Sequence, residues 1–280
     1  MARRVAVVTG ANKGIGLSTV KFLCQKFDGD VYLCSRDQTR GEDAVKELEG
    51  LGLKPKLFIL AIDDEKTIVN LREMLKKEYG GLDVLVNNAA IAFPFNSTVP
   101  FGEQATKTLD INYFAVSNVC DILFPVLKPG ARVVNVSSAL GLLDRVKCPE
   151  LKQILSSPQL TRPALDSLAR EYVELAQTGA HSEKGWPNSN YSTSKILFSA
   201  LTWIQHRGFK NDPRPDIVIN AVHPGYVDTD MTNHKGHLTP DQGAQSSVMA
   251  ALVPPNGHPR GAFIWNDCSV VDWKSHEFKF

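Results

Sequence analysis

A phenol and an ammonium group stand four positions apart in the stretch YSTSK, from Tyr191 to Lys195. On a helix this spacing puts the two side chains on one face, one turn apart, so that the positive charge can act on the phenol. A nearby cation favours the phenolate, and about 4 kcal/mol of differential interaction would lower the tyrosine pKa by roughly three units. The pair is therefore a candidate for general acid/base chemistry near neutral pH. Solvated helices carry the same spacing by chance, so its meaning depends on the rest of the chain.

A glycine-rich turn near the N-terminus is the second candidate. VAVVTGANKGIG runs from a strand-like segment into a helix-like one, with Gly10, Gly14 and Gly16 in the spacing G-x-x-x-G-x-G. Glycine lets the backbone turn tightly and approach a pyrophosphate at the helix N-terminus. Because the turn follows the first strand and opens a helix, it predicts a dinucleotide site more strongly than a plain glycine-rich connection would.

The charges after the second strand-like run indicate which dinucleotide would bind. NAD-binding folds usually carry an acid about 20 residues after the glycine turn. This chain instead has Arg36 at the end of the second run, with Lys13 inside the turn. Two cations near the ribose would suit a 2′-phosphate, so the sequence favours NADP(H). Asp37 follows directly, and a different loop conformation could bring its carboxylate to the ribose instead.

Short apolar runs rich in β-branched residues recur along the chain, most of them separated by helix-like stretches. These runs are VAVVTG, DVYLCS, KLFIL, LDVLVNNA, ARVVNVSS, DIVINAVHPG and GAFIW. The alternation is typical of a doubly wound α/β fold, a Rossmann arrangement in which crossover helices cover both faces of a parallel sheet. A chain of 280 residues can bury its core as one unit, so we expect a single domain over 1–280.

One connection is much longer than a simple crossover needs. Ser138 and Tyr191 are 53 positions apart, and a helical stripe of apolar residues runs from Leu165 to Leu175 between them. We therefore expect a helical insertion over residues 142–187, packed on the main fold just before Tyr191.

Composition points to a small-molecule partner. A net charge of +1 with 43% hydrophobic residues shows no commitment to nucleic acid or to an anionic membrane, and no apolar run approaches spanning length. Five cysteines without CxxC or metal-like spacing indicate reduced thiols in a cytoplasmic protein. His234 and His237 have a metal-like separation, but no obvious third ligand is near, so no metal site is expected.

Six motifs taken in order resemble the short-chain dehydrogenase/reductase family and cover nearly the whole chain. They are TGANKGIG at 9–16, NNAA at 87–90, Asn112 in DINYF, NVSS ending at Ser138, YSTSK at 191–195 and HPGYVDTDM at 223–231. Within the family the chain is most similar to the monomeric animal carbonyl reductases, in which a similar insertion precedes the catalytic tyrosine. The resemblance implies NADPH-dependent reduction of aldehydes, ketones and quinones. It also implies a monomer, because the inserted helices would cover the surface that related oligomeric reductases use for pairing.

The resemblance implies a role for each matching residue. Tyr191 would donate a proton to the substrate oxygen, and Lys195 would hold the ribose hydroxyls and lower the tyrosine pKa. Ser138 would hydrogen-bond the carbonyl, and Asn112 would support a chain of water molecules. The implied substrate contacts are Ser138, Tyr191 and Tyr226. The implied cofactor contacts are Gly10, Asn12, Lys13, Gly14, Ile15, Gly16, Arg36, Ile62, Asp63, Asn88, Ala89, Tyr191, Lys195, Pro224, Gly225, Val227 and Thr229.

The chain departs from the family pattern at three places. Ala90 stands where the motif NNAG ends in glycine, and Tyr226 stands where close relatives carry a tryptophan. Ala61 replaces an aspartate that binds adenine, unless Asp63 takes over that role. Two other functions stay open from the sequence. One is a non-catalytic NADP(H)-binding sensor whose inserted helices engage a protein partner, and the other is an NADP-dependent dehydrogenase of prostaglandin or steroid alcohols.

Overall fold

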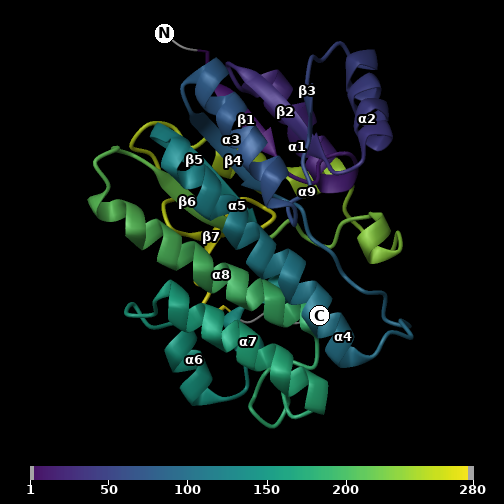
Figure 1. Cartoon of the computed structure of the whole chain (residues 1–280), viewed down its shortest axis with the longest axis vertical. Helices are drawn as coiled ribbons and strands as arrows, with labels where there is room; N and C mark the ends of the chain where they lie inside the picture. Colours follow the sequence, from purple (N-terminus) through teal and green to yellow (C-terminus); the bar gives the residue numbers. More distant parts are fainter. Residues whose placement is uncertain (1–2, 277–280) are drawn as a thin grey trace.

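Eight strands form one sheet in the order β3-β2-β1-β4-β5-β6-β7-β8 (Figure 1). The computed structural model describes residues 3–276, so residues 1–2 and 277–280 of the expected domain lie outside the described part. The strands are β1 (Val5–Val8), β2 (Asp30–Ser35), β3 (Lys56–Ile59), β4 (Leu82–Asn87), β5 (Leu127–Val136), β6 (Val218–Val222), β7 (Phe263–Ile264) and β8 (Val270–Val271). Strands β1 to β7 pair in parallel, and each lies within one of the predicted apolar runs except β5, which begins four residues before its run. The predicted parallel α/β fold is confirmed, with an antiparallel edge strand, β8, that the sequence patterns did not predict.

Helices cover both faces of this sheet (Figure 1). One face packs against α1 (Gly14–Lys26), α2 (Gln38–Gly50) and α9 (Pro240–Ala251), and the other against α3 (Glu65–Tyr79), α5 (Val116–Leu123) and α8 (Asn190–Gly208). Strand β1 shows why, because Val5 and Val7 belong to one apolar core while Ala6 and Val8 belong to the other. Successive side chains of a strand point to opposite faces, so a strand buried on both faces must be apolar throughout. Within residues 3–276, no helix is both long and apolar enough to cross a bilayer.

The long connection between β5 and α8 contains helices α6 (Pro149–Leu155) and α7 (Arg162–Thr178), which lie beyond α8 on the side away from the sheet (Figure 1). Helix α7 packs against α8 and against α4 (Phe101–Leu109). Tyr172 of α7 is fully buried, and its hydroxyl donates to Asn190 Oδ1 at 2.7 Å. Asn190 Nδ2 donates in turn to the carbonyl oxygen of Phe101 at 3.2 Å. Helix α7 therefore holds Asn190, the first residue of α8, which directly precedes Tyr191.

Truncation of Tyr172 tests how firmly this region is packed. We expect Tyr172→Ala to lower the free energy of unfolding by about 3–5 kcal/mol, because it leaves a cavity where a large ring is buried. Tyr172→Phe keeps the ring, loses one hydrogen bond and should cost only about 1 kcal/mol. Denaturant unfolding measures both values. Equal losses for the two variants would contradict ring packing as the main contribution.

Candidate active site

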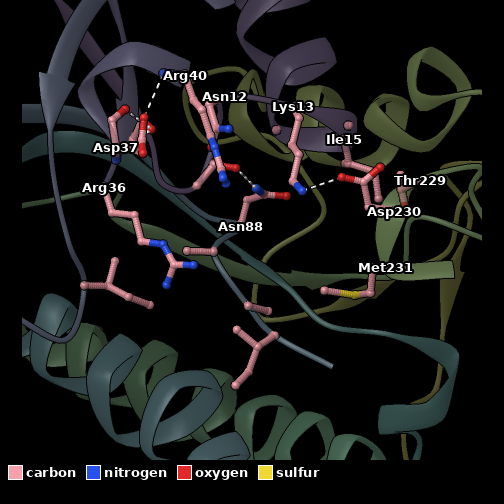
Figure 2. A pocket seen from close by; sticks show the side chains of 18 of the residues that line it. Asn12, Lys13, Ile15, Arg36, Asp37, Arg40, Asn88, Thr229, Asp230 and Met231 are labelled. Carbon is pink, nitrogen blue, oxygen red and sulfur yellow. Dashed lines mark hydrogen bonds and ion pairs between the residues drawn. The ribbon is translucent and has the colours of Figure 1, made fainter. Parts of the chain in front are cut away.

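The turn between β1 and α1 forms one wall of a cavity of about 430 Å³ at the carboxyl edge of the sheet (Figure 2). Gly10 and Gly14 have φ angles of 60° and 57°, a region that other residues rarely adopt. A Cβ added to Gly16 would lie 2.5 Å from Asn88 Nδ2, so this position needs glycine for close approach. The glycine pattern is therefore required by the local backbone.

The segment after β4 holds this turn in place. Asn88 Nδ2 donates to the carbonyl oxygens of Thr9 and Gly10 at 3.0 Å each. The Thr9 hydroxyl accepts the backbone N–H groups of Asn88 and Ala89, also at 3.0 Å. Ala90 is not among the described residues with a left-handed backbone, so its methyl group adds no backbone strain where relatives carry glycine.

The amino end of α1 is open to an anion. Lys13 precedes the helix in an extended conformation, and within the described residues no side chain caps this end. The first turn contains Gly14, Ile15 and Gly16, all of which line the cavity. The unpaired N–H groups of a helix N-terminus, with the positive end of the helix dipole, bind phosphate groups well.

Two guanidinium groups point into the far end of the cavity (Figure 2). Arg36 follows β2, and Arg40 lies in the first turn of α2. Asp37 stands between them, and its Oδ1 accepts the backbone N–H of Arg40 at 2.9 Å, which caps α2. The carboxylate of Asp37 is therefore already used in capping α2. The sequence reasoning missed Arg40, although its position four residues after Arg36 could have revealed it.

Lys13 lies away from these arginines. Its Nζ is 2.5 Å from Asp230 Oδ2, on the loop between β6 and α9 (Figure 2). His234 lies beside the same carboxylate, with Nε2 3.1 Å from Asp230 Oδ1 and Nδ1 2.7 Å from Asp228 Oδ1. The Lys13 ammonium lowers the pKa of Asp230. Lys13 and Arg36 both line the cavity, but a carboxylate on a distant loop holds the lysine side chain.

Tyr191 and Lys195 lie on one face of α8, as their spacing predicts. Lys195 Nζ is 5.6 Å from the centre of the Tyr191 ring. The lysine is almost completely buried, and its Nζ donates to the carbonyl oxygen of Val136 at 2.7 Å. Ser189 caps the helix by accepting the backbone N–H of Ser192 at 3.2 Å. The end of β5 therefore sets the position of the ammonium group beneath the tyrosine ring.

The tyrosine pKa shifts in the direction opposite to the one expected from the sequence. Burial raises the pKa of Tyr191 to about 12, although a hydrogen bond with the Ser138 side chain acts against this. Burial also lowers the pKa of Lys195 to about 7. Removal from water is the largest cause of the pKa shift of both groups. The phenol is consequently protonated at neutral pH and able to donate.

Ser138 and Asn112 complete the predicted catalytic set. Of the adjacent serines, Ser137 bonds to Ser199 Oγ at 2.8 Å, which leaves Ser138 next to Tyr191. Asn112 lies in a π-helical turn, Asp110–Ala115, a feature often found at functional sites. Its Oδ1 accepts the Ile91 N–H at 2.8 Å, and its Nδ2 donates to Ser194 Oγ at 3.1 Å. Asn112 thus ties the loop after β4 to α8.

The structure brings twelve of the predicted cofactor contacts together around the cavity. They are Gly10, Asn12, Lys13, Gly14, Ile15, Gly16, Arg36, Ile62, Asp63, Asn88, Ala89 and Thr229. Asp63 is among them and Ala61 is not, so the carboxylate at 63 is available near the expected adenine position. The sequence reasoning missed several lining residues brought in by loops, among them Asp228, Asp230, Met231 and His234.

The remaining predicted contacts lie outside the lining of this cavity, in the catalytic set and on the loop after β6. Pro224 and Gly225 follow His223, the first residue after that strand. Val227 is buried, and a Cβ added to Gly243 of α9 would lie 2.5 Å from its Cγ2, so its side chain packs on that helix. Only the Val227 backbone can therefore face a cofactor. Tyr226 is 47% exposed on the same loop.

Comparisons with known proteins agree with this geometry. The sequence pattern of the family described as short chain dehydrogenase matches residues 4–149. The chain is 45% identical over 274 residues to carbonyl reductase (NADPH) 1 of Rattus norvegicus, covering 97% of this chain and 99% of the relative. Identity to carbonyl reductase (NADPH) 1 of Homo sapiens is 45% over 272 residues, covering 96% and 98%. Among solved structures, salutaridine reductase from Papaver somniferum has a TM-score of 0.84 at 31% identity, covering 95% of this chain and 100% of that one.

Proposed function

This chain belongs to the short-chain dehydrogenase family, and from that premise we propose that it reduces carbonyl compounds to alcohols with NADPH. The observation that carries the proposal is the 45% identity, over nearly the full length of both chains, to enzymes named carbonyl reductase (NADPH). Its substrates are small molecules with a reducible carbonyl group, namely aldehydes, ketones and quinones.

The residues present fit NADPH. A backbone cradle with positive φ angles at Gly10 and Gly14 and the uncapped N-terminus of α1 suit the pyrophosphate. Arg36 and Arg40 suit the 2′-phosphate, since guanidinium groups bind phosphate through paired, charge-assisted hydrogen bonds. Asp37 caps α2 and is therefore less able to hold a free 2′-hydroxyl, which favours NADPH over NADH.

Each catalytic side chain has a defined task in this proposal. When bound, NADPH supplies the hydride that reduces the carbonyl carbon. Tyr191 donates its hydroxyl proton to the carbonyl oxygen, and Ser138 donates a hydrogen bond to the same oxygen. Lys195 would hold the hydroxyls of the nicotinamide ribose, and Asn112 would support a chain of water molecules that resupplies the proton. Such placement of reacting groups, with proton transfer, is what a protein adds to a cofactor's chemistry.

Tyr191 is in the protonated state that the donor in carbonyl reduction needs. A phenol whose pKa is raised to about 12 is neutral near pH 7 and can act as an acid. The same groups would also serve oxidation of a prostaglandin or steroid alcohol, but the 45% identity to enzymes named carbonyl reductase (NADPH) favours reduction. A non-catalytic NADP(H) sensor would have no need of all four catalytic groups. Carbonyl reduction is therefore the function that we put forward.

We further propose that the protein is a cytoplasmic monomer. Helix α7 packs on α8 and α4, and the family resemblance implies that such inserted helices cover the surface that oligomeric reductases use for pairing, which supports the monomer. Five unpaired thiols, at Cys24, Cys34, Cys120, Cys148 and Cys268, suit a reducing compartment. Sedimentation equilibrium tests the monomer, and a mass of twice 30.8 kDa would contradict it.

The Lys13–Asp230 pair should weaken cofactor binding slightly, because Asp230 competes with a cofactor phosphate for the lysine. We expect Asp230→Asn to lower the Kd for NADPH by about twofold to fivefold, the range for an exposed ion pair. The effect should shrink at high salt, which screens exposed charges. Fluorescence titration with NADPH measures it, with Glu103→Gln as a matched control because Glu103 pairs with Lys107 on α4. Weaker binding by Asp230→Asn would contradict the competition.

A direct assay tests the proposed function itself. Purified protein is mixed with NADPH and a panel of carbonyl compounds that includes menadione, and the loss of reduced nicotinamide absorbance is followed. We expect turnover with NADPH well above the rate without protein. No turnover with any member of the panel, despite NADPH binding, would favour the sensor.

A further inference from the structure

His223 lies directly after β6, between two segments that carry predicted site residues. Its Nδ1 accepts the backbone N–H of Ala139 at 3.0 Å and that of Gly225 at 3.3 Å. Ala139 directly follows Ser138, and Gly225 directly follows Pro224. One ring nitrogen therefore joins the serine segment to the turn that is expected to meet the nicotinamide.

Backbone hydrogen bonding between β5 and β6 ends just before these two segments, so a different contact must hold the segments together. The final backbone bond between β5 and β6 runs from Ser137 N to the carbonyl oxygen of Val222 at 2.8 Å. Beyond that bond, the segments that follow β5 and β6 run into different loops. The imidazole nitrogen then supplies the acceptor that the neighbouring backbone no longer offers to Ala139.

The ring itself is held firmly. The backbone N–H of His223 donates to the carbonyl oxygen of Ile264 at 2.8 Å, and its own carbonyl accepts from Ser246 Oγ at 3.3 Å. The ring packs on Trp265 with ring centres 4.4 Å apart, and the residue is only 6% exposed. Because the ring is held in this way, it can keep the Ala139 and Gly225 segments at a fixed separation.

Acceptance of two N–H groups requires an unprotonated Nδ1, hence the neutral ring with its proton on Nε2. Burial lowers the pKa of His223 to about 4, which keeps the ring neutral at physiological pH. His276 is the titratable group on the far side of Trp265, with ring centres 4.8 Å apart. The geometry and the charge state therefore favour the same tautomer.

We propose that His223 is a positioning residue for the reaction. Its neutral imidazole holds Ser138 at a fixed separation from the Pro224–Gly225 turn, and thus holds the substrate carbonyl relative to the nicotinamide. The inference rests on the proposed function, since it assigns Ser138 and this turn their places in carbonyl reduction. It adds a residue that touches neither substrate nor cofactor.

Two substitutions separate the acceptor from the bulk of the ring. Asparagine places Oδ1 two bonds from Cβ, as Nδ1 of histidine is placed, and so retains an acceptor in the right position. Leucine fills similar space without an acceptor. We expect His223→Leu to lower kcat by about tenfold to a hundredfold, because small misplacements of reacting groups cost that much. The Kd for NADPH should stay within about twofold, and His223→Asn should recover most of the lost kcat.

A second readout does not depend on turnover. Amide hydrogen exchange at Ala139 and Gly225 in the protein without cofactor reports the two hydrogen bonds directly. Exchange at both amides should be faster in His223→Leu than in the wild type, and close to wild type in His223→Asn.

Acid stability gives a third readout, with a defined sign. The folded-state pKa of His223, about 4, lies below the ordinary value of 6.5. The neutral ring therefore contributes stability above about pH 6.5, and this contribution is lost as the pH falls towards 4. The melting temperature of the wild type should fall more in this window than that of His223→Asn, while the carboxylates affect both proteins equally.

The outcomes are distinguishable. Wild-type kcat and unchanged amide exchange in His223→Leu would overturn the inference. An equal loss of kcat in His223→Leu and His223→Asn would also overturn it, since the ring packing and not the acceptor would then matter. A wild-type protein without NADPH-dependent reductase activity would overturn the proposed function instead, and the amide exchange would still report whether the link exists.

Discussion

Tyr191→Phe is expected to lower kcat at least about a hundredfold, because a positioned proton donor typically contributes a factor of about 10² to 10⁴. The variant keeps the ring above Lys195 and removes only the hydroxyl that would protonate the carbonyl oxygen. Cofactor binding should be nearly unchanged, since the expected phosphate and adenosine contacts line the cavity and Tyr191 does not. Steady-state rates and NADPH titration together measure both expectations.

Tyr79→Phe is the matched control. Tyr79 is buried, and its hydroxyl donates to Asp30 Oδ2 at 2.7 Å, where Asp30 begins β2 at the opposite edge of the sheet. The Tyr79→Phe variant also loses a phenol oxygen, but it should keep the wild-type kcat. A wild-type rate of ketone reduction by Tyr191→Phe would contradict the assignment of Tyr191 as the proton donor.

The double substitution of Arg36 and Arg40 by glutamine should raise the KM for NADPH by about a hundredfold or more. Each hydrogen bond to a charged group contributes about 1.5–3 kcal/mol, or roughly tenfold to a hundredfold in binding. NADH lacks the 2′-phosphate, so its KM should change by no more than about threefold. The preference between the two cofactors, measured as the ratio of kcat/KM values, should therefore fall sharply.

The single substitutions Arg36→Gln and Arg40→Gln show how much each arginine contributes to the change in the KM for NADPH. Arg40→Gln tests the residue that the sequence reasoning did not include, and Arg72→Gln is a control because Arg72 pairs with Glu73 on α3. Equal losses with NADPH and NADH would show that the arginines shape the cavity without reading the phosphate, against the account given above.

The fold could be predicted from the sequence because parallel strands buried on both faces leave a strong local signal. Strand β1 is apolar at every position, and turn residues bound it. Strand β8 has only two residues, and its Val270 is exposed, so no periodicity distinguishes it from a loop. Its pairing depends on a tertiary contact with β7 that no short pattern contains.

The candidate site divides in a similar way. Tyr191, Lys195 and the three glycines of the turn are set by spacing within one helix or one turn, so the sequence places them correctly relative to each other. The capture of Lys13 by Asp230 joins residues 217 positions apart and could not be predicted. The raised pKa of Tyr191 could not be predicted either, because removal from water depends on everything that covers the side chain.

Hydride transfer can be observed directly by mass spectrometry of the alcohol formed from a simple ketone. The reaction uses purified wild-type protein with NADPH that carries deuterium at both positions of the reactive nicotinamide carbon. The account predicts one deuterium on the carbinol carbon of the product, with little product when NADH replaces NADPH. Absence of product, or product without deuterium, would contradict carbonyl reduction by this protein.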